Sequence, residues 1–279
     1  MDEITAEYVV AEIREAVPLQ TRIYTTVAAK TDLGRVRENN EDKFEFYEPS
    51  DENLLATRGK VYVVCDGMGG HSAGQIASEL ATKTFLDVFL NHPSHEPEIA
   101  GISAANAANR FVYDVGCTVP GRKGMGTTLT ALALIQDRGL VIQVGDSRLY
   151  RLRQSMLEQI TTDHTWVEDV VSQGLLTREE AENHQYRHVI TRAIGTEANV
   201  PVDHFWIDLE VGDIFLLCSD GLTGHVSDAE IHDTLERFGP AESCWQLVSM
   251  ALAGGGSDNC TVLVTRVDDL QRIDQSPIA

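Results

Sequence analysis

Basic side chains are scarce in this 279-residue chain, which has 22 lysines and arginines against 43 aspartates and glutamates. The formal net charge of −21 repels the phosphate backbone of nucleic acids and the headgroups of anionic lipids. We therefore expect neither nucleic acid nor a membrane surface as a partner. The hydrophobic content of 43% is high enough for a real core, so the chain is not of the disordered class.

Long apolar runs and paired cysteines are also missing. No run approaches the roughly 18 residues of a membrane span. The acidic N-terminus lacks the basic start and apolar core of a signal peptide. The five cysteines form no C-x-x-C pair, which favours reduced thiols and a cytoplasmic location. Cys65, Cys218 and Cys260 are expected to be small buried residues on strands, and no histidine spacing is typical of zinc.

Hydrophobic periodicity divides the chain into strands and paired helices. Residues 1–24 are predicted as an appended helix that ends near Pro18. The polar residues 268–279 are expected to fray. Strands are predicted at 23–29, 43–47, 61–65, 127–135, 140–144, 148–152, 213–219 and 260–267. Helices are predicted at 72–90, 98–115, 227–238 and 241–252, with capping boxes at Ser227 and at Thr177.

The connections suggest how these elements are arranged. The tight link Gly145-Asp146-Ser147 predicts a hairpin between its flanking strands. Residues 161–200 carry several charges and few strand signals, which favours a mobile insertion over a site. Short strands closed by hairpins, with helices in pairs, indicate an α+β fold of antiparallel sheets with helices outside.

Four aspartates stand beside glycine, serine or asparagine at the ends of apolar, strand-like segments: Asp66, Asp146, Asp220 and Asp258. Each one taken alone is typical of a turn or a helix cap. Together they predict an oxygen-rich cation site, which favours Mg²⁺ or Mn²⁺ over zinc. The carbonyl of Gly67 could add a ligand, because glycine lets the backbone turn toward a cation. Two such ions can activate a water and clamp a phosphoryl group.

Arg37, Glu41 and Asp42 form a second dense polar patch, in a loop between two predicted strands. An arginine binds a phosphate monoester through two parallel hydrogen bonds. Arg37 is therefore a candidate for phosphate binding. The alternative is an ordinary surface salt bridge.

These motifs, taken in order, resemble the PP2C (PPM) family of metal-dependent serine/threonine protein phosphatases. The resemblance covers residues 25–267. Its motifs are Arg37-x-x-x-Glu41-Asp42, Asp66-Gly67-Met-Gly-Gly70, Gly126-Thr127-Thr128, Gly145-Asp146-Ser147-Arg148-x-Tyr150, Ser219-Asp220-Gly221 and Asp258-Asn259. The Met-Gly-Gly form is similar to the bacterial branch.

The resemblance implies a four-layer αββα sandwich of two antiparallel sheets flanked by helix pairs. It implies that Asp66 and the Gly67 carbonyl bridge two metal ions, with Asp220 and Asp258 as further ligands. A third, weaker ion would bind at Asp146 and Asp220. Glu41 and Asp42 would hold metal-bound waters, and residues 161–200 would be the flap beside the substrate. The implied partners are phosphorylated proteins and a serine/threonine kinase.

The residue after Asp66-Gly67 separates this chain from eukaryotic members, which often have a histidine there. Met68 stands in that position, and His71 follows three residues later. His71 could protonate the leaving oxygen, or it could orient the following helix. Two other functions remain open, namely hydrolysis of small phosphate esters and phosphoprotein binding without catalysis. No G-x-x-x-x-G-K nucleotide-binding loop is present.

Overall fold

Strand β3 (Lys60–Cys65) shows why the chain forms layers, because its side chains alternate between two apolar environments. Tyr62 and Val64 pack in a core between two sheets, whereas Val61, Val63 and Cys65 pack against helices. All five residues have 0% exposure. Successive side chains of a strand point to opposite faces. A strand that is apolar on both faces therefore needs a layer on each side.

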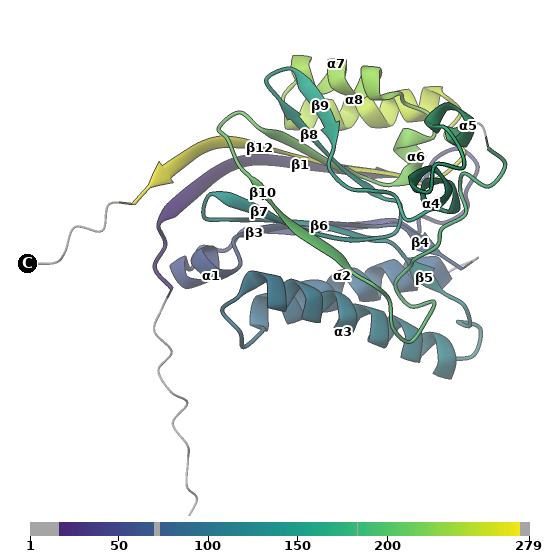
Figure 1. Ribbon diagram of the computed structural model, residues 1–279, viewed down its shortest axis with the longest axis horizontal. Helices are drawn as coiled ribbons and strands as arrows, with labels where there is room; N and C mark the ends of the chain where they lie inside the picture. The colour runs from purple at the N-terminus through teal and green to yellow at the C-terminus, as the bar shows by residue number, and fades with distance from the viewer. Residues whose placement is uncertain (1–16, 70–72, 183, 274–279) are drawn as a thin grey trace, which may run out of the picture.

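The computed structural model describes residues 17–69, 73–182 and 184–273, and its two large sheets are antiparallel and face each other (Figure 1). The first sheet contains, in spatial order, β1 (Thr21–Asp32), β12 (Cys260–Arg272), β11 (Ile214–Cys218), β8 (Arg148–Arg153) and β9 (Met156–Gln159). The second contains β10 (Asp203–Asp208), β7 (Arg138–Val144), β6 (Leu129–Ile135), β3 and β2 (Lys43–Tyr47).

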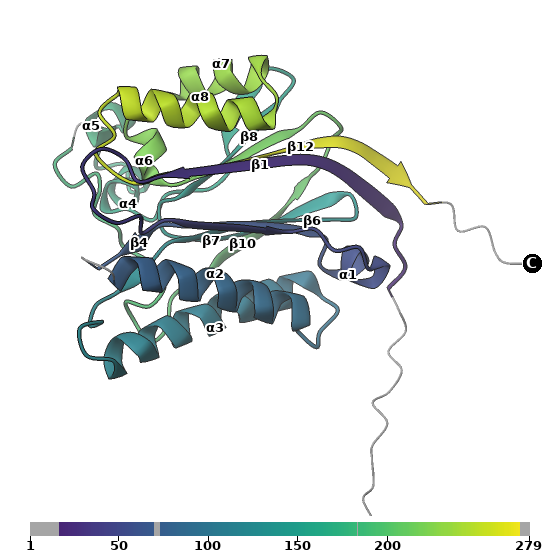
Figure 2. The same cartoon turned by 180° about the vertical axis from the view of Figure 1, so that it is seen from behind.

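Helix pairs cover the outer faces of both sheets. Helices α2 (Ala73–Asn91) and α3 (Pro97–Thr118) lie on the second sheet, and α7 (Asp228–Arg237) and α8 (Pro240–Ala253) lie on the first (Figures 1 and 2). The shorter elements are α1 (Glu52–Thr57), α4 (Trp166–Ser172), α5 (Arg178–Glu182), α6 (Asp220–Thr223) and the pair β4 (Gly67–Met68) and β5 (Gly126–Thr127). The predicted four-layer αββα sandwich is confirmed.

Both predicted capping boxes are present. Ser227 and Glu230 cap the start of α7, each side chain accepting the other residue's backbone N–H. Thr177 and Glu180 do the same at the start of α5. The sequence signal holds because each box needs only residues three positions apart.

The predicted hairpin at Gly145-Asp146-Ser147 is wrong. Strand β7 pairs with β6 and β10, whereas β8 pairs with β9 and β11. The chain therefore crosses from the second sheet to the first at Asp146. Gly145 permits the crossing, because its φ of +106° is in a region that other residues rarely adopt. A turn signal shows where a chain bends but does not identify the next strand's partner.

Several bounds also differ from the prediction. β12 continues to Arg272, past the predicted end at Val267, because Thr21–Tyr24 of β1 pair with its last residues. Residues 21–24 therefore belong to a strand rather than to the expected N-terminal helix, whose residues 1–16 lie outside the described part. The sequence interpretation also missed β10, an edge strand whose side chains are mostly half-buried.

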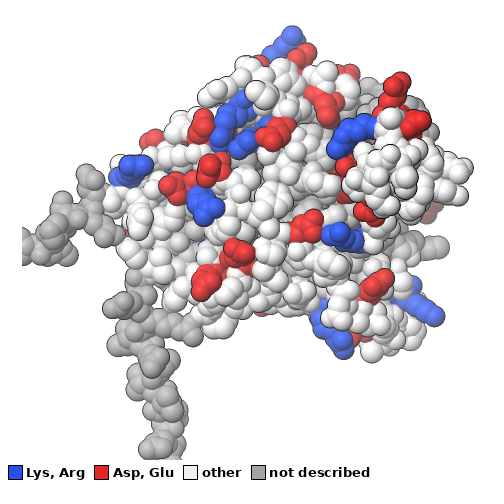
Figure 3. All heavy atoms as spheres, in the orientation of Figure 1, with Lys and Arg blue, Asp and Glu red and all other residues white. Residues whose placement is uncertain are grey.

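The positions of three cysteines agree with the sequence prediction, and charged side chains of both signs lie on the surface. All five cysteines are free, and Cys65, Cys218 and Cys260 are buried on strands as predicted. On the face in Figure 3, basic and acidic side chains are interspersed rather than gathered into separate patches. Among the described helices, none is long and apolar enough to cross a bilayer.

Candidate metal and phosphate site

The four predicted aspartates come together at one end of the sandwich. Asp66 follows β3, Asp146 lies between β7 and β8, Asp220 begins α6 after β11, and Asp258 precedes β12. Burial raises the pKa of Asp66 well above its usual value, and the negative charges of the other three raise it further. Carboxylates shift one another in this way only when they are close. The fold therefore brings together residues up to 192 positions apart (258 − 66).

The backbone of Asp66 is held by two threonines of the Gly126-Thr127-Thr128 motif. Thr128 Oγ1 accepts the Asp66 N–H at 2.8 Å, and the Thr128 N–H donates to the Asp66 carbonyl at 2.8 Å. Thr127 Oγ1 donates to the same carbonyl at 2.8 Å. Thr128 Oγ1 also lies 2.7 Å from Ser147 Oγ, beside Asp146. In the sequence these threonines stand only as part of a motif, and the structure shows that they fix the position of Asp66.

Glycine is required at position 67 because helix α2 approaches the backbone there. A Cβ on Gly67 would overlap the carbonyl oxygen of Gly74 in the first turn of α2. The Gly67 N–H donates to the carbonyl of Glu41 at 3.2 Å. Ser78 of α2 also donates its hydroxyl to that carbonyl. The Arg37–Asp42 loop, Gly67 and α2 therefore pack as one unit.

Asp42 is almost fully buried behind the aspartates, with 1% exposure. Ser219 Oγ donates to its Oδ2 at 2.7 Å, and Ser219 Oγ in turn accepts the N–H of Thr261 at 3.0 Å. The Oδ1 atom has no hydrogen-bond partner among the described residues. Burial raises the pKa of Asp42 to about 7, and the charges of Asp220 and Asp258 act in the same direction. A buried carboxylate with an unpartnered oxygen is suited to accept from a water or from a cation's hydration shell.

Asn259 joins the loop of Arg37 to the loop of Asp258. Its Oδ1 accepts the N–H of Glu41 at 2.8 Å, and its Nδ2 donates to the carbonyls of Leu33 and Asn39. Arg37 Nη2 then lies 2.6 Å from Asp258 Oδ2. That hydrogen bond raises the pKa of Arg37. The predicted alternative, a salt bridge of Arg37, is therefore present, and its partner is one of the candidate metal ligands.

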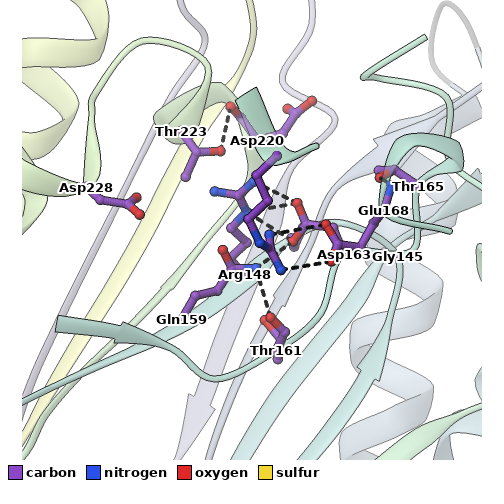
Figure 4. Close-up of polar contacts among 12 residues, drawn as sticks. Gly145, Arg148, Gln159, Thr161, Asp163, Thr165, Glu168, Asp220, Thr223 and Asp228 are labelled. Atoms are coloured by element: carbon purple, nitrogen blue, oxygen red, sulfur yellow. Dashed lines mark hydrogen bonds and ion pairs between the residues drawn. The ribbon is translucent and has the colours of Figure 1, made fainter. Parts of the chain in front are cut away.

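Asp146 is 7% exposed, and burial raises its pKa to about 7, with Asp220 adding to the shift. Two positions further on, Arg148 makes three hydrogen bonds of 2.7 to 3.0 Å to the carboxylate of Asp163, at the base of the flap (Figure 4). Burial lowers the pKa of Arg148, but the adjoining Asp163 outweighs burial and raises it. The ion pair fixes the turn that carries Asp146 to the start of the flap.

The flap, residues 161–200, contains α4 and α5. An isolated β-bridge between Thr165 and Ile190 closes it on itself, and a second one, between Thr127 and Ile194, joins it to β5 beside the site. Burial raises the pKa of Asp220, the charge of Asp258 raises it further, and His188 of the flap lies close enough to oppose that shift in part. The flap therefore borders the aspartates. His71, the candidate proton donor, lies outside the described residues, and its role stays a prediction.

The chemistry of these residues fits hard divalent cations. Carboxylates that raise one another's pKa repel one another when ionised, and a bound cation reduces that repulsion. Within residues 17–69, 73–182 and 184–273, no three His, Cys, Asp or Glu side chains already converge in a geometry that holds a metal ion. Asp258 instead contacts Arg37. A donor set of carboxylate oxygens fits Mg²⁺ or Mn²⁺, and the candidate ligands would have to move closer together to hold an ion.

Comparison with known proteins agrees with this arrangement. Residues 35–250 match the family model described as protein phosphatase 2C. The chain belongs to this family. It is 38% identical over 251 residues to the serine/threonine protein phosphatase PstP of Mycobacterium tuberculosis, covering 90% of this chain and 46% of PstP. It is 34% identical over 248 residues to the serine/threonine phosphatase stp of Listeria innocua, covering 87% and 96%.

A solved structure gives the same result for the fold. The catalytic domain of PstP, crystallised in complex with two manganese ions, matches with a TM-score of 0.74 at 37% identity, covering 88% of this chain and 99% of that one. The present chain spans about half the length of the full PstP protein. The family predicted from the sequence motifs is confirmed.

Proposed function

We propose that this protein hydrolyses phosphoserine and phosphothreonine in other proteins, with Mn²⁺ or Mg²⁺ as cofactor. The observation that carries the proposal is the cluster of mutually repelling aspartates around Asp66, with Arg37 2.6 Å from one of them. Carboxylates hold cations, and a guanidinium binds phosphate. Relatives that are named as serine/threonine phosphatases, one of them solved with two manganese ions, support the same reaction.

The residues take distinct roles in this proposal. Asp66, the Gly67 carbonyl, Asp220 and Asp258 would hold two ions, and Asp146 with Asp220 would hold a third, weaker one. When bound, the ions would activate a water for direct attack on phosphorus and neutralise the phosphoryl oxygens. Arg37 would grip the phosphate of the substrate. Asp42 would accept hydrogen bonds from ordered water through its unpartnered oxygen, and Glu41 would hold water beside it.

Metal dependence gives the first test. We expect turnover of an aryl phosphate to need added Mn²⁺ or Mg²⁺ and to stop when a chelator is added. Zinc-dependent turnover, or full activity in chelator, would refute the proposal. Rates on a phosphopeptide and on a nucleotide then separate a protein phosphatase from an enzyme for small phosphate esters. A metal-loaded protein that binds the phosphopeptide without turnover would instead be a regulatory binding module.

The third ion has its own test. Asp146→Ala should impair turnover more than it impairs occupancy of the two-metal centre, because only Asp220 is shared between the two. A crystal structure of the variant at modest Mn²⁺ should keep two ions and lose the third. Loss of all three would place Asp146 among the primary ligands.

The partners and the location form part of the same proposal. The substrates would be proteins phosphorylated by a serine/threonine kinase, whose action this protein would oppose. Five free cysteines support a reducing compartment such as the cytoplasm. A comparison of the phosphoproteome with and without the protein would identify the substrates. An unchanged set of phosphoserine and phosphothreonine sites would contradict this part.

A further inference from the structure

The flap holds the turn of Asp146 through a buried histidine that the sequence motifs did not single out. His164 and Gly145 exchange hydrogen bonds. The Gly145 N–H donates to His164 Nδ1 at 3.0 Å, and the His164 N–H donates to the Gly145 carbonyl at 3.0 Å. His164 is 5% exposed. The residue just before Asp146 is therefore bound by the flap through both its backbone groups.

These contacts assign the tautomer of His164. A backbone N–H can only donate, so Nδ1 must accept, and the ring proton must be on Nε2. Nε2 lies 3.1 Å from Asp203 Oδ2, and this carboxylate accepts the proton's hydrogen bond. Arg192 Nη1 donates to the other oxygen of Asp203 at 2.9 Å and balances its charge. The same nitrogen lies 3.4 Å from Nε2, which cannot accept from it while it carries the ring proton. The first residue of β10 thus sets the orientation of an imidazole that contacts the Asp146 turn.

Gly145 also connects the Asp146 turn to Asp66, through the side chain of Thr128. Its φ is +106°, and a Cβ there would overlap the Thr128 side chain. Thr128 accepts the N–H of Asp66. Beyond Asp146, Arg148 is bound by Asp163, the residue before His164 (Figure 4). Two adjacent flap residues therefore hold the Asp146 turn from both sides, and Gly145 packs against the threonine that positions Asp66.

We propose that His164, held in one neutral tautomer by Asp203, is a positioning residue that sets the place of Asp146 through the backbone of Gly145. The proposal rests on the proposed function, in which Asp146 holds a metal ion. Because coupling between two sites is reciprocal, cation binding at Asp146 should also stabilise the base of the flap.

Two substitutions of nearly equal polarity distinguish the role of Nδ1, which contacts Gly145, from that of Nε2, which contacts Asp203. In His164→Asn the amide oxygen can take the place of Nδ1 and accept from Gly145, but the side chain no longer reaches Asp203. In His164→Gln the amide can donate to Asp203, but the Gly145 N–H loses its acceptor. His232→Gln on α7 is the control, since that histidine contacts Asp233 and the carbonyl of Ser155 instead.

The first measurement is the Mn²⁺ concentration for half-maximal turnover of a phosphopeptide. Loss of a residue that orients a metal ligand typically costs about 10–100-fold in metal affinity or activity. We expect His164→Gln to raise the half-activating concentration about tenfold or more. His164→Asn should stay within about threefold of the parent, and KM at saturating Mn²⁺ should change little in either variant. Equal shifts in both variants would overturn the proposal, because they would indicate a packing role only.

A second measurement does not depend on catalysis. Hydrogen exchange of peptides covering residues 163–172 and 186–194 is followed with and without Mn²⁺. Mn²⁺ should slow exchange in the parent, in His164→Asn and in His232→Gln, and should slow it much less in His164→Gln. Flap protection by Mn²⁺ that is the same in all four proteins would refute the coupling. If the parent shows this protection but no turnover, the proposed function fails while the positioning role stands.

Asp203 offers a check at a half-exposed position, where a variant is easily tolerated. Asp203→Asn keeps an oxygen that accepts the Nε2 proton and should leave the half-activating Mn²⁺ concentration within about twofold. Asp203→Ala removes the acceptor and should raise that concentration in the same direction as His164→Gln. If Asp203→Ala behaves as the parent does, Asp203 does not set the orientation of His164.

Discussion

Arg37 and Asp258 form an ion pair, with Nη2 of the arginine 2.6 Å from Oδ2 of the aspartate, although the two residues are 221 positions apart in the sequence. Their side chains are 51% and 33% exposed, and such pairs are worth only about 0–1 kcal/mol. A side chain proposed for phosphate therefore contacts one proposed for metal. A cation at Asp258 would compete for this carboxylate and leave the guanidinium available to the substrate.

The ion pair leads to a prediction for substrate binding. Arg37→Ala should raise KM for a phosphopeptide about tenfold or more and lower kcat less, because a charged hydrogen bond is worth about 1.5–3 kcal/mol and would act alike in the ground and transition states. Arg35→Ala is the control, since Arg35 is exposed and its contact to Gly256 is made by the backbone. Steady-state kinetics at saturating Mn²⁺ decide the matter, and an unchanged KM would remove Arg37 from the phosphate site.

Removal of a central carboxylate should separate activity from stability. Asp66→Ala and Asp258→Ala should each abolish turnover, because each removes a proposed ligand. The metal-free variants should melt at the same temperature as the parent or higher, because the remaining carboxylates repel one another less. Thermal melts in chelator measure this. Two grossly unfolded variants would show that these aspartates have a structural role instead.

Stability of the metal-free protein should depend on pH through Asp146. The pKa of Asp146 in the folded state, about 7, lies above its ordinary value. The protonated side chain therefore contributes its full share to the free energy of unfolding below about pH 4, and that share is lost as the pH rises to about 7. In Asp146→Asn the side chain cannot ionise, so the variant does not lose this stability as the pH rises. In chelator the variant should therefore match the parent near pH 4 and exceed it by a few kcal/mol at pH 8, on the order of 1.4 kcal/mol per pKa unit.

Denaturant unfolding at several pH values tests this prediction. Saturating Mn²⁺ provides the control, since a bound cation favours the ionised carboxylate and should reduce or reverse the advantage of the variant. An advantage that is equal at pH 4 and pH 8 would mean that ionisation of Asp146 is not its cause.

His71 is tested through the leaving group. Phosphoserine leaves as a strongly basic alkoxide that needs a proton, whereas nitrophenolate is stable as an anion. General acid catalysis is worth about 10²–10⁴-fold. His71→Ala should therefore slow phosphopeptide hydrolysis at least about tenfold more than nitrophenyl phosphate hydrolysis. Equal losses on both substrates would leave His71 with a role in orienting the loop.

Much of the fold was predictable because its signals are local. The alternating residues of β3 require apolar layers on both sides, and the capping boxes at Ser227 and Thr177 need only residues three positions apart. The motifs that contain the aspartates and Arg37 are also short and local, and their order along the chain identified the family. A short edge strand such as β10 was missed, because its half-buried side chains carry a weak periodic signal.

The sequence alone predicted which residues would carry the chemistry, and the tertiary structure decided what holds them in place. Thr128 reaches Asp66 across 62 positions, Ser219 reaches Asp42 across 177, and Asn259 reaches Glu41 across 218. The passage of the chain from one sheet to the other at Asp146, and the hydrogen bonds between His164 and Gly145, likewise depend on which strands pair. Hydrogen bonds between distant residues leave no periodic trace in a single sequence, because their geometry exists only after the sheets have packed.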